Sequence, residues 1–204
     1  MKRIFESGDF ISNRITDSVY HDVITESRQF ATGGTLSYQT TVFLSHKHQD
    51  LEDLRGIIGL LQNQFKAKVY IDSMDSEMPK TTNGVTAQRI KQIIKQSNKF
   101  ILLATNTAIE STWCNWELGY GDAFKFQRNI AIFPIKPKGT LDTNYKGHEY
   151  MQIYPHIIHY SGFEKNCWGD PIGKAGYYVE SYISNSRGQT YTNLQSLRDW
   201  LNDN

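Results

Sequence analysis

"KFILLATNTAIESTWCNWELGYGDAFKFQRNIAIFPI", residues 99–135, contains two short apolar runs on either side of a segment with helical spacing. The runs at 99–105 and 129–135 are continuously apolar rather than alternating, which is typical of parallel strands covered on both faces. The intervening segment, 109–127, predicts a helix that the Ser-Thr pair near its start can cap. A strand, a helix and a strand joined by short links predict a right-handed crossover in a parallel sheet.

The same alternation continues on both sides of this unit. The other predicted strands are 40–45, 67–72 and 156–160, and the other predicted helices are 49–65, 85–97 and a closing helix over 192–202 with Thr192 as its cap. The stretches 136–155 and 161–178 lack regular periodicity and are predicted as loops. The pattern therefore predicts an α/β fold with a central parallel sheet of about five strands and helices on both faces.

The first part of the chain differs from the rest. Apolar residues recur at helical spacing between Ile11 and Val23 in a polar background, and the glycine-containing stretch 31–35 then breaks the pattern as a hinge. We therefore expect residues 1–37 to form an N-terminal helical arm. Residues 38–204 are expected to form the main domain, with an extended C-terminal portion.

The composition excludes several classes of protein. Apolar residues make up 39% of the 204 positions and charged residues 21%, and a formal net charge of +1 offers no field to attract nucleic acid or an anionic membrane. No apolar run approaches the ~20 residues needed to cross a bilayer, and the basic N-terminus is not followed by the apolar segment of a secretory signal. Cys114 and Cys167 make neither a disulfide framework nor a zinc motif. We therefore expect a cytoplasmic protein without a bound metal, a nucleic-acid partner or a membrane partner.

Chemically active side chains follow the ends of three predicted strands. In open α/β sheets, ligands bind beyond the carboxyl ends of the strands. At this edge we expect Ser45, His46 and Lys47 at the end of the strand 40–45, and Asp72 at the end of the strand 67–72. The helix that follows the strand 99–105 adds Trp113 and Glu117.

Glu117 is the residue that the helical pattern does not explain. Three aromatic residues share one stripe of the helix with it, and we expect this stripe to face the core: Trp113, Tyr120 and Phe124. An acid on such a stripe is either a structural acid, paired with a helix terminus or an arginine, or an acid held there for chemistry. Aromatic walls from Trp113 and Trp116 would exclude water and raise its pKa.

A nucleotide is a chemically reasonable ligand for this edge. The sequence contains neither a GxxxxGK[ST] loop nor a GxGxxG fingerprint, so loop amides, helix N-termini and side chains such as Ser45 and Lys47 would have to hold its phosphates. Glu117 could then act on a glycosidic bond, where a carboxylate stabilises the positive charge that develops on the ribose or takes a proton from the attacking group.

Four stretches together resemble the Toll/interleukin-1 receptor (TIR) domain. "VFLSHKHQD" (42–50) resembles the family's first box, and "VYIDSMDSEMP" (69–79) resembles its second strand and BB loop. "IKQIIKQSNKFILLAT" (90–105) matches the helix and strand that follow, and "STWCNWEL" (111–118) is similar to the Ser-x-Trp-Cys-x-x-Glu-Leu motif of enzymatic members. The boxes occur in the family's order, and the resemblance implies a flavodoxin-like fold.

The resemblance also implies an activity. Enzymatic members of the family cleave the nicotinamide–ribose bond of NAD+, and some of them make cyclic ADP-ribose signals. The catalytic glutamate of the motif corresponds to Glu117, and its aromatic residue corresponds to Trp113, which would be a stacking wall. NAD+ is then the substrate, and no separate cofactor is expected. The predicted NAD+-binding residues are Ser45, His46, Lys47, Asp72 and Trp113.

The resemblance further implies how the protein is used. A TIR domain that stands nearly alone resembles the TIR proteins of bacterial Thoeris anti-phage systems, which make a diffusible signal for a separate effector. We expect the active state to be a homo-oligomer formed through TIR–TIR contacts. Two alternatives stay open: a non-catalytic scaffold that uses its BB loop (73–82) for homotypic contacts, and a nucleotide hydrolase related to the nucleoside deoxyribosyltransferases.

Overall fold

The computed structural model describes most of the chain. It covers residues 4–32, 39–72, 84–125, 127–140, 149–163, 169, 173–184 and 190–203. The BB loop that the sequence predicts at 73–82 lies outside the described residues, as does most of the predicted glycine hinge.

The described residues form an alternating series of strands and helices. The strands are β1 (Phe5–Glu6), β2 (Thr41–Ser45), β3 (Lys68–Ile71), β4 (Lys99–Ala104), β5 (Ile130–Lys136), β6 (His156–Tyr160), β7 (Gly176–Ser184) and β8 (Thr190–Ser196). The α-helices are α1 (Asp17–Ala31), α2 (Leu51–Gly59), α3 (Gly84–Gln96), α4 (Asn106–Ile109), α5 (Thr112–Lys125) and α6 (Leu197–Asn202). A π-helical turn, Leu60–Gln64, continues α2. No helix in the described part of the chain has the length and apolar character needed to span a membrane.

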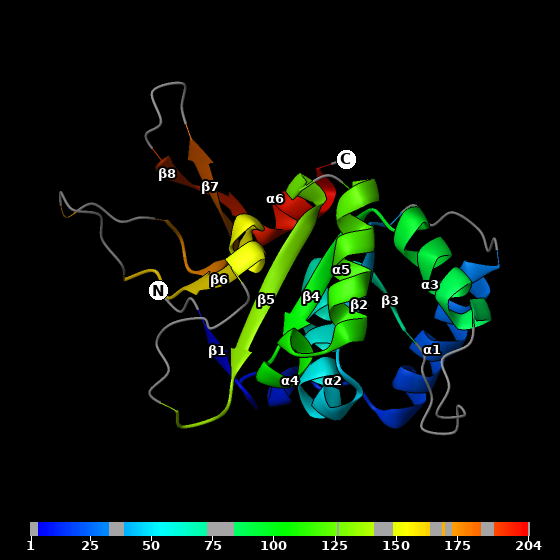
Figure 1. Cartoon of the computed structure of the whole chain (residues 1–204). Coiled ribbons are helices and arrows are strands. Elements are labelled where there is room, and N and C mark those ends of the chain that lie inside the picture. The colour runs from blue at the N-terminus through cyan, green and yellow to red at the C-terminus, as the bar shows by residue number, and fades with distance from the viewer. Residues whose placement is uncertain are drawn as a thin grey trace.

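Five parallel strands form the centre of the sheet, in the order β3-β2-β4-β5-β6 (Figure 1). β3 lies on one side of β2, and β4, β5 and β6 follow in sequence order on its other side. This is the strand order of flavodoxin-like folds. The predicted parallel sheet with helices on both faces is therefore confirmed. The register pairs Leu44 with Ile71 and Ser45 with Leu102, so the carboxyl ends of β2, β3 and β4 lie at one edge.

The sheet is larger than the five strands predicted. β7 pairs antiparallel with β6, β8 pairs antiparallel with β7, and β1 pairs in parallel with the end of β5. The prediction of a closing helix over 192–202 was wrong at its start, because residues up to Ser196 belong to β8. The α6 helix begins at Leu197, and Ser196 rather than Thr192 caps it by accepting a hydrogen bond from the Asp199 backbone N–H at 3.1 Å.

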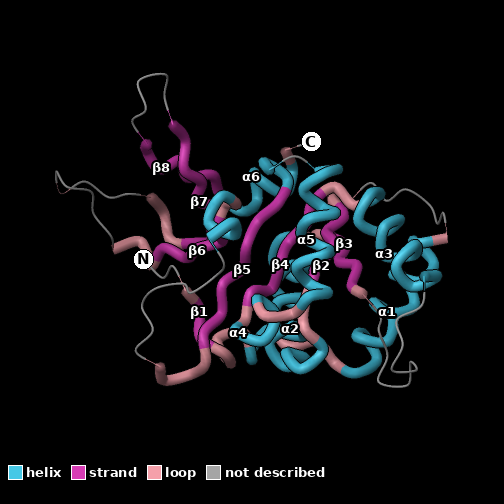
Figure 2. The backbone as a smooth tube through the Cα atoms, in the orientation of Figure 1, coloured by secondary structure: helices cyan, strands magenta, loops and turns pink. Residues whose placement is uncertain are grey.

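Strand residues alternate between two buried layers. Leu44, for example, lies in the layer under α2 and α6, whereas its neighbour Phe43 lies in the layer under α3, α4 and α5. Figure 2 shows helices in front of and behind the strands. Because both faces of the central strands are buried, a one-residue slip of register would merely exchange one apolar layer for the other, and the flanking polar residues such as Ser45 fix the ends.

The α1 helix covers the β3 edge of the sheet. Ser27 is fully buried on α1, where its hydroxyl donates to the Val23 carbonyl at 2.6 Å and accepts from the Ile71 backbone N–H at 3.0 Å. The rings of Phe30 and Tyr70 stack with centroids 3.9 Å apart. An edge N–H that would otherwise be exposed is thus paired by a side chain, which protects the edge from joining another strand.

The rest of the N-terminal segment packs into the core beside β5 and α2. The ring of Phe10 lies edge-on to Phe133 at 5.3 Å, and Phe5 lies 4.9 Å from the same ring. The predicted helical arm therefore contains α1 but also a strand and core aromatics that the helical pattern did not indicate. The predicted boundary between residues 37 and 38 falls in the part of the chain that is not described and stays a prediction.

We predict that Gly59→Ala destabilises the fold. A Cβ at Gly59 would overlap the backbone carbonyl of Asn13, and overpacking against a backbone costs about 1–3 kcal/mol. Thermal unfolding should then occur roughly 2–4 °C lower for each kcal/mol lost in a chain of this size. The matched control is Gly119→Ala on α5, where a Cβ meets no atom within 4 Å and should leave the melting temperature equal or higher. Equal melting temperatures for Gly59→Ala and the wild type would show that the N-terminal segment does not pack on α2 as described.

Candidate active site

The candidate active site lies at the edge where β2, β3 and β4 end. Ser45 is the last residue of β2, Asp72 follows β3, and α5 follows β4 through the short helix α4. The helix α5 packs on the sheet with Glu117 on its buried face. Three segments that lie far apart in the sequence therefore place one hydroxyl and two carboxylates together, as the topology predicts for adjacent parallel strands.

The Glu117 carboxyl group is the centre of this arrangement. Its side chain has no exposed surface, and its Oε2 accepts a hydrogen bond of 2.5 Å from the Ser45 hydroxyl. Its Oε1 is buried and has no hydrogen-bond partner among the described residues. A buried carboxyl oxygen without a partner costs stability and is uncommon in native proteins, so this oxygen needs an explanation beyond packing.

The environment raises the pKa of Glu117 well above its usual value. Burial is the main cause, because desolvation penalises the ionised form, and the negative charge of Asp72 adds to it. The hydrogen bond from Ser45 and the nearby indole N–H of Trp113, which itself donates to Asp72, lower the pKa of Glu117 but do not outweigh burial. The buried acid therefore holds its proton at pH values where an exposed glutamate would be ionised.

Trp113 is fixed between the two carboxylates. Its indole Nε1 donates a hydrogen bond of 3.0 Å to Asp72 Oδ2, and its ring lies 4.8 Å from that of Trp116. The bond joins the end of β3 to the first turn of α5. Asp72 therefore has two effects: it orients the Trp113 indole, and its charge raises the pKa of Glu117.

The residues after β2 form the entrance. A cavity of about 110 Å³ is lined by His46, Lys47, His48, Asp72, Ser111 and Trp113. The His46 Nδ1 lies 3.3 Å from the Leu44 carbonyl oxygen, and burial lowers the pKa of its imidazole to about 4, so the ring is neutral near pH 7. Glu117 does not line this cavity, so contact between its carboxyl and a ligand requires a movement of Glu117 or Trp113.

The expected aromatic stripe of α5 is confirmed only in part, because Trp113 and Tyr120 are half-buried against the core whereas Phe124 is exposed. The buried face of α5 instead carries Cys114, Glu117, Leu118, Gly121 and Lys125. The rings of Trp116, Tyr120 and Phe124 form a ladder along the flank of the helix, and Phe124 is 49% exposed. Glu117 is therefore more deeply buried than the aromatic residues that were expected to surround it.

Two features explain this inversion. Gly121 lets α5 approach the sheet, because a Cβ there would lie 2.9 Å from the Phe100 ring. On the flank, the ammonium groups of Lys91 and Lys95 on α3 lie over the aromatic ladder, with Lys95 Nζ 4.5 Å from the Phe124 centroid. Cation–π contacts of this kind stabilise rings that are only half-buried.

Sequence reasoning did not assign two parts of this edge. Ser111, one of the two predicted caps of α5, does cap the helix, since its hydroxyl accepts a hydrogen bond from the Cys114 backbone N–H at 3.4 Å, but its burial at the cavity was not predicted. Asp50, at the start of α2, accepts hydrogen bonds from Thr105 at 2.5 Å and from Thr107 at 2.9 Å. Burial raises the pKa of Asp50, and these bonds tie the end of β4 to α2. Asp50 lies in the first box and in the helix predicted at 49–65, but its bonds to Thr105 and Thr107 join segments that the sequence does not connect.

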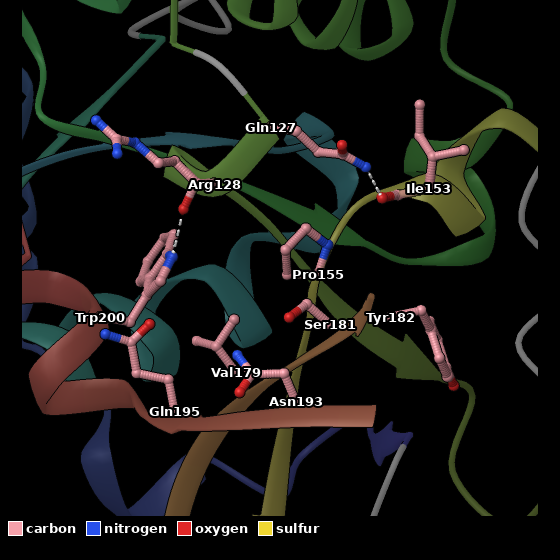
Figure 3. Close-up of a pocket in the computed structure, with 10 residues that line it drawn as sticks. All are labelled: Gln127, Arg128, Ile153, Pro155, Val179, Ser181, Tyr182, Asn193, Gln195 and Trp200. Carbon is pink, nitrogen blue, oxygen red and sulfur yellow. Dashed lines mark hydrogen bonds between the residues drawn. The ribbon is translucent and has the colours of Figure 1, made fainter. Parts of the chain in front are cut away.

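A larger cavity, of about 310 Å³, lies between the start of β6, the β7–β8 hairpin and α6 (Figure 3). Its side chains include Gln195 and Asn193 of β8, while the Trp200 indole N–H donates to the Arg128 carbonyl at 2.7 Å. In Figure 3 the guanidinium of Arg128 points away from the other lining residues. No carboxylate, histidine or cysteine lines this cavity in the described part of the chain, so it lacks groups for acid–base or nucleophilic chemistry.

Within the same described residues, no three potential metal ligands gather at one place.

Comparison with known proteins places these features in a family. The sequence profile described as "TIR domain" matches residues 42–161, which is more than half of the chain. The chain belongs to the TIR domain family. The matched part of this TIR protein contains the whole candidate active site, whereas α1, β7, β8 and α6 lie outside it.

One curated relative of this TIR protein is named "Probable 3' cyclic ADP-D-ribose synthase ThsB'", from Bacillus cereus (strain MSX-D12). The two sequences are 31% identical over 123 residues, which is 57% of this chain and 59% of the relative. The chain thus matches somewhat more than half of the relative's length. The roles of Glu117, Ser45, His46, Lys47, Asp72 and Trp113 in this TIR protein stay predictions, which their common location supports.

The raised pKa of Glu117 predicts a pH-dependent loss of stability that Glu117→Gln should remove. In the unfolded chain Glu117 ionises near its ordinary value of 4.5, whereas in the folded protein it keeps its proton to higher pH. Between these two pKa values unfolding releases a proton, so the free energy of unfolding falls as pH rises. We expect equal melting temperatures for the wild type and Glu117→Gln at about pH 4. As pH rises, the wild type should melt at progressively lower temperature than Glu117→Gln, by roughly 2–4 °C for each kcal/mol of unfolding free energy that it loses. Parallel melting curves at all pH values would contradict the raised pKa.

Proposed function

We propose that this TIR protein cleaves the nicotinamide–ribose bond of NAD+, releases nicotinamide and joins the remaining ADP-ribose into a cyclic product that serves as a signal in antiviral defence. The observation that carries the proposal is the Glu117 carboxyl group, which is fully buried beside Ser45 with one oxygen unpartnered. Membership of the TIR family and similarity to a protein named as a cyclic ADP-ribose synthase support the choice of substrate and product.

The chemistry needs a negative charge beside the ribose. When the glycosidic bond breaks, its electron pair goes to the pyridinium nitrogen, so nicotinamide leaves neutral and the ribose carries an oxocarbenium-like positive charge. The Glu117 carboxylate would stabilise that charge and then accept the proton of the attacking hydroxyl group. When the hydroxyl belongs to the same ADP-ribose, the product is cyclic, and when water attacks instead, the product is linear ADP-ribose.

Binding of the cationic substrate would ionise Glu117, whose proton would leave to solvent before the glycosidic bond breaks. Burial and the charge of Asp72 hold the acid protonated in the free protein. A pyridinium ring placed against Trp113 brings a positive charge close to the carboxyl, and an opposite charge lowers the pKa of an acid. Ser45 would keep one carboxylate oxygen in place while the unpartnered Oε1 faces the ribose. NAD+ is thus a substrate in this proposal, and the chain needs no separate cofactor.

We assign the other substrate contacts from the cavity of about 110 Å³ that His46, Lys47 and Trp113 line. The Lys47 side chain at its wall would bind the diphosphate, and the neutral His46 imidazole would bind a polar group without adding charge. A cavity of about 110 Å³ holds a ring but not a dinucleotide, so a movement or a second copy must complete the site. We include assembly through TIR–TIR contacts, and a separate effector that detects the product, in the proposal.

The first prediction from this proposal is that Glu117→Gln abolishes nicotinamide release. Removing a positioned acid–base group lowers turnover by roughly 10²–10⁴-fold, and Gln keeps the shape and the hydrogen bond from Ser45. The measurement is a mass-spectrometric time course of NAD+ incubated with each protein at high concentration, and the mass of the second product separates cyclisation from hydrolysis. Glu110→Gln, at an exposed position just before α5, is the matched control and should keep full activity. Full turnover by Glu117→Gln would rule out its catalytic role. Retained signalling in cells together with no turnover by the wild type would favour a scaffold.

The second prediction concerns Ser45→Ala. The hydrogen bond from Ser45 lowers the Glu117 pKa, so its removal should raise that pKa further. Because kcat/KM reports ionisations of the free enzyme, its rise with pH should move to higher pH in Ser45→Ala than in the wild type. Ser111→Ala is the control, since its hydroxyl lies at the cavity but bonds to the Cys114 backbone. That control should change the height of the pH profile and leave its position unaltered. An unshifted profile in Ser45→Ala would show that Glu117 does not govern the profile.

A further inference from the structure

A separate cavity of about 410 Å³ opens on the face of the sheet that α2 and α6 cover. Its walls include Phe65 at the end of the π-helical turn, His159 of β6, Tyr177 of β7, Ser196 of β8 and Arg198 of α6. It shares no lining residue with the cavity of about 110 Å³ that Trp113 lines, and α5 packs on the other face. Three of these wall residues follow the segment matched by the TIR family, so the added hairpin and helix build this cavity.

Arg198 is held in place without an acidic partner. Its guanidinium carbon lies 5.6 Å from the centroid of the Phe65 ring, and one Nη donates to the Gln64 carbonyl at 2.9 Å. No described residue forms an ion pair with it. The cation–π contact and one backbone bond hold the guanidinium beside Phe65, which leaves its other N–H donors for a ligand at a lower entropic cost than a flexible lysine would require.

The other walls supply rings and donors. The Phe65 and Tyr177 rings meet edge-to-face at 6.0 Å, and the His159 ring lies 4.9 Å from that of Tyr177. No carboxylate lines the cavity among the described residues. Asp9 acts on the pKa of Tyr177, which burial chiefly raises, but it lies outside the cavity lining. The Ser196 and Tyr178 hydroxyls at its wall already donate to Asp199 and to the Lys174 carbonyl, so the cavity offers chiefly a fixed cation and aromatic surface, which suits a ligand with a planar ring and a negative group.

We propose that this cavity is a second ligand site that binds a mononucleotide, with its phosphate on Arg198 and its base against the ring cluster of Phe65 and Tyr177. A volume of about 410 Å³ falls in the range of small-molecule sites and fits one nucleotide unit rather than a polymer. Arginine offers planar paired donors for phosphate oxygens, and bases stack on aromatic rings and on guanidinium planes. The site does not depend on NAD+ cleavage, because none of its residues belongs to the candidate active site.

The test is calorimetric binding of AMP, with adenosine and inorganic phosphate as separate probes. Wild type should bind AMP more tightly than either fragment, because the cavity holds both parts at once. Arg198→Gln should weaken AMP binding about 10–100-fold, the loss expected for charge-assisted hydrogen bonds to one phosphate. The matched control is Arg128→Gln, another exposed arginine outside this cavity, which should bind AMP like the wild type.

Two further variants test the alternatives. Arg198→Lys tests whether charge alone explains AMP binding, and Trp113→Ala tests whether AMP binds at the candidate active site. Arg198→Lys keeps the charge but not the planar donors and should bind with intermediate affinity, while an unchanged melting temperature shows that each variant is folded. Trp113→Ala alters the candidate active site and should leave AMP binding intact. Three results would overturn the proposal: no saturable binding up to on the order of 5 mM, equal affinity of the wild type and Arg198→Gln, or loss of AMP binding in Trp113→Ala alone.

Discussion

The buried contact between Glu117 and Ser45 is the constraint around which the site is organised. It joins the last residue of β2 to the middle of α5, and it places a carboxyl group in a largely apolar layer. The helix approaches the sheet closely only because Gly121 has no side chain against Phe100. The large rings of α5 are consequently displaced to its flank, where the lysines of α3 cover them. The position of one acid therefore accounts for the small residue beneath it and the aromatic residues beside it.

The segments outside the five parallel strands pack at the edges and ends of the central sheet. On one side, α1 supplies the Ser27 hydroxyl to a β3 backbone N–H, and on the other side the β7–β8 hairpin continues the sheet beyond β6. In the N-terminal segment, β1 pairs with the end of β5, and the Lys136 ammonium lies 3.2 Å from the Glu6 carboxylate. These segments bury the ends and edges of the parallel core while the carboxyl edge of β2 and β3 keeps its cavity.

The central strands could be predicted because their apolar runs are continuous and separated by amphipathic helices. The cluster of Ser45, Asp72 and Glu117 could also be predicted, since parallel topology brings strand ends together. Other features depend on contacts that a local pattern does not contain. The sequence "TNLQSL" at 192–197 suits a strand or a helix equally well, and its pairing with β7 decides between them. The bond between Trp113 and Asp72 joins residues 41 positions apart, and the two-residue β1 has no pattern at all.

The electrostatics of the site favour a cationic ligand over an anionic one at Glu117. An arginine beside this acid would keep it ionised but would also cancel its charge, whereas here the charged residue that acts on its pKa is another acid, Asp72. The free protein avoids an uncompensated buried charge because Glu117 keeps its proton. In the proposed reaction, the pyridinium of NAD+ supplies the missing positive charge on binding, so the carboxylate is already in place when the ribose becomes cationic. After nicotinamide leaves neutral, the developing charge on the ribose replaces it as the partner of the carboxylate, and the interaction strengthens toward the transition state. An acid that is costly to bury in the free protein is therefore suited to catalysis because its counter-charge arrives with the substrate.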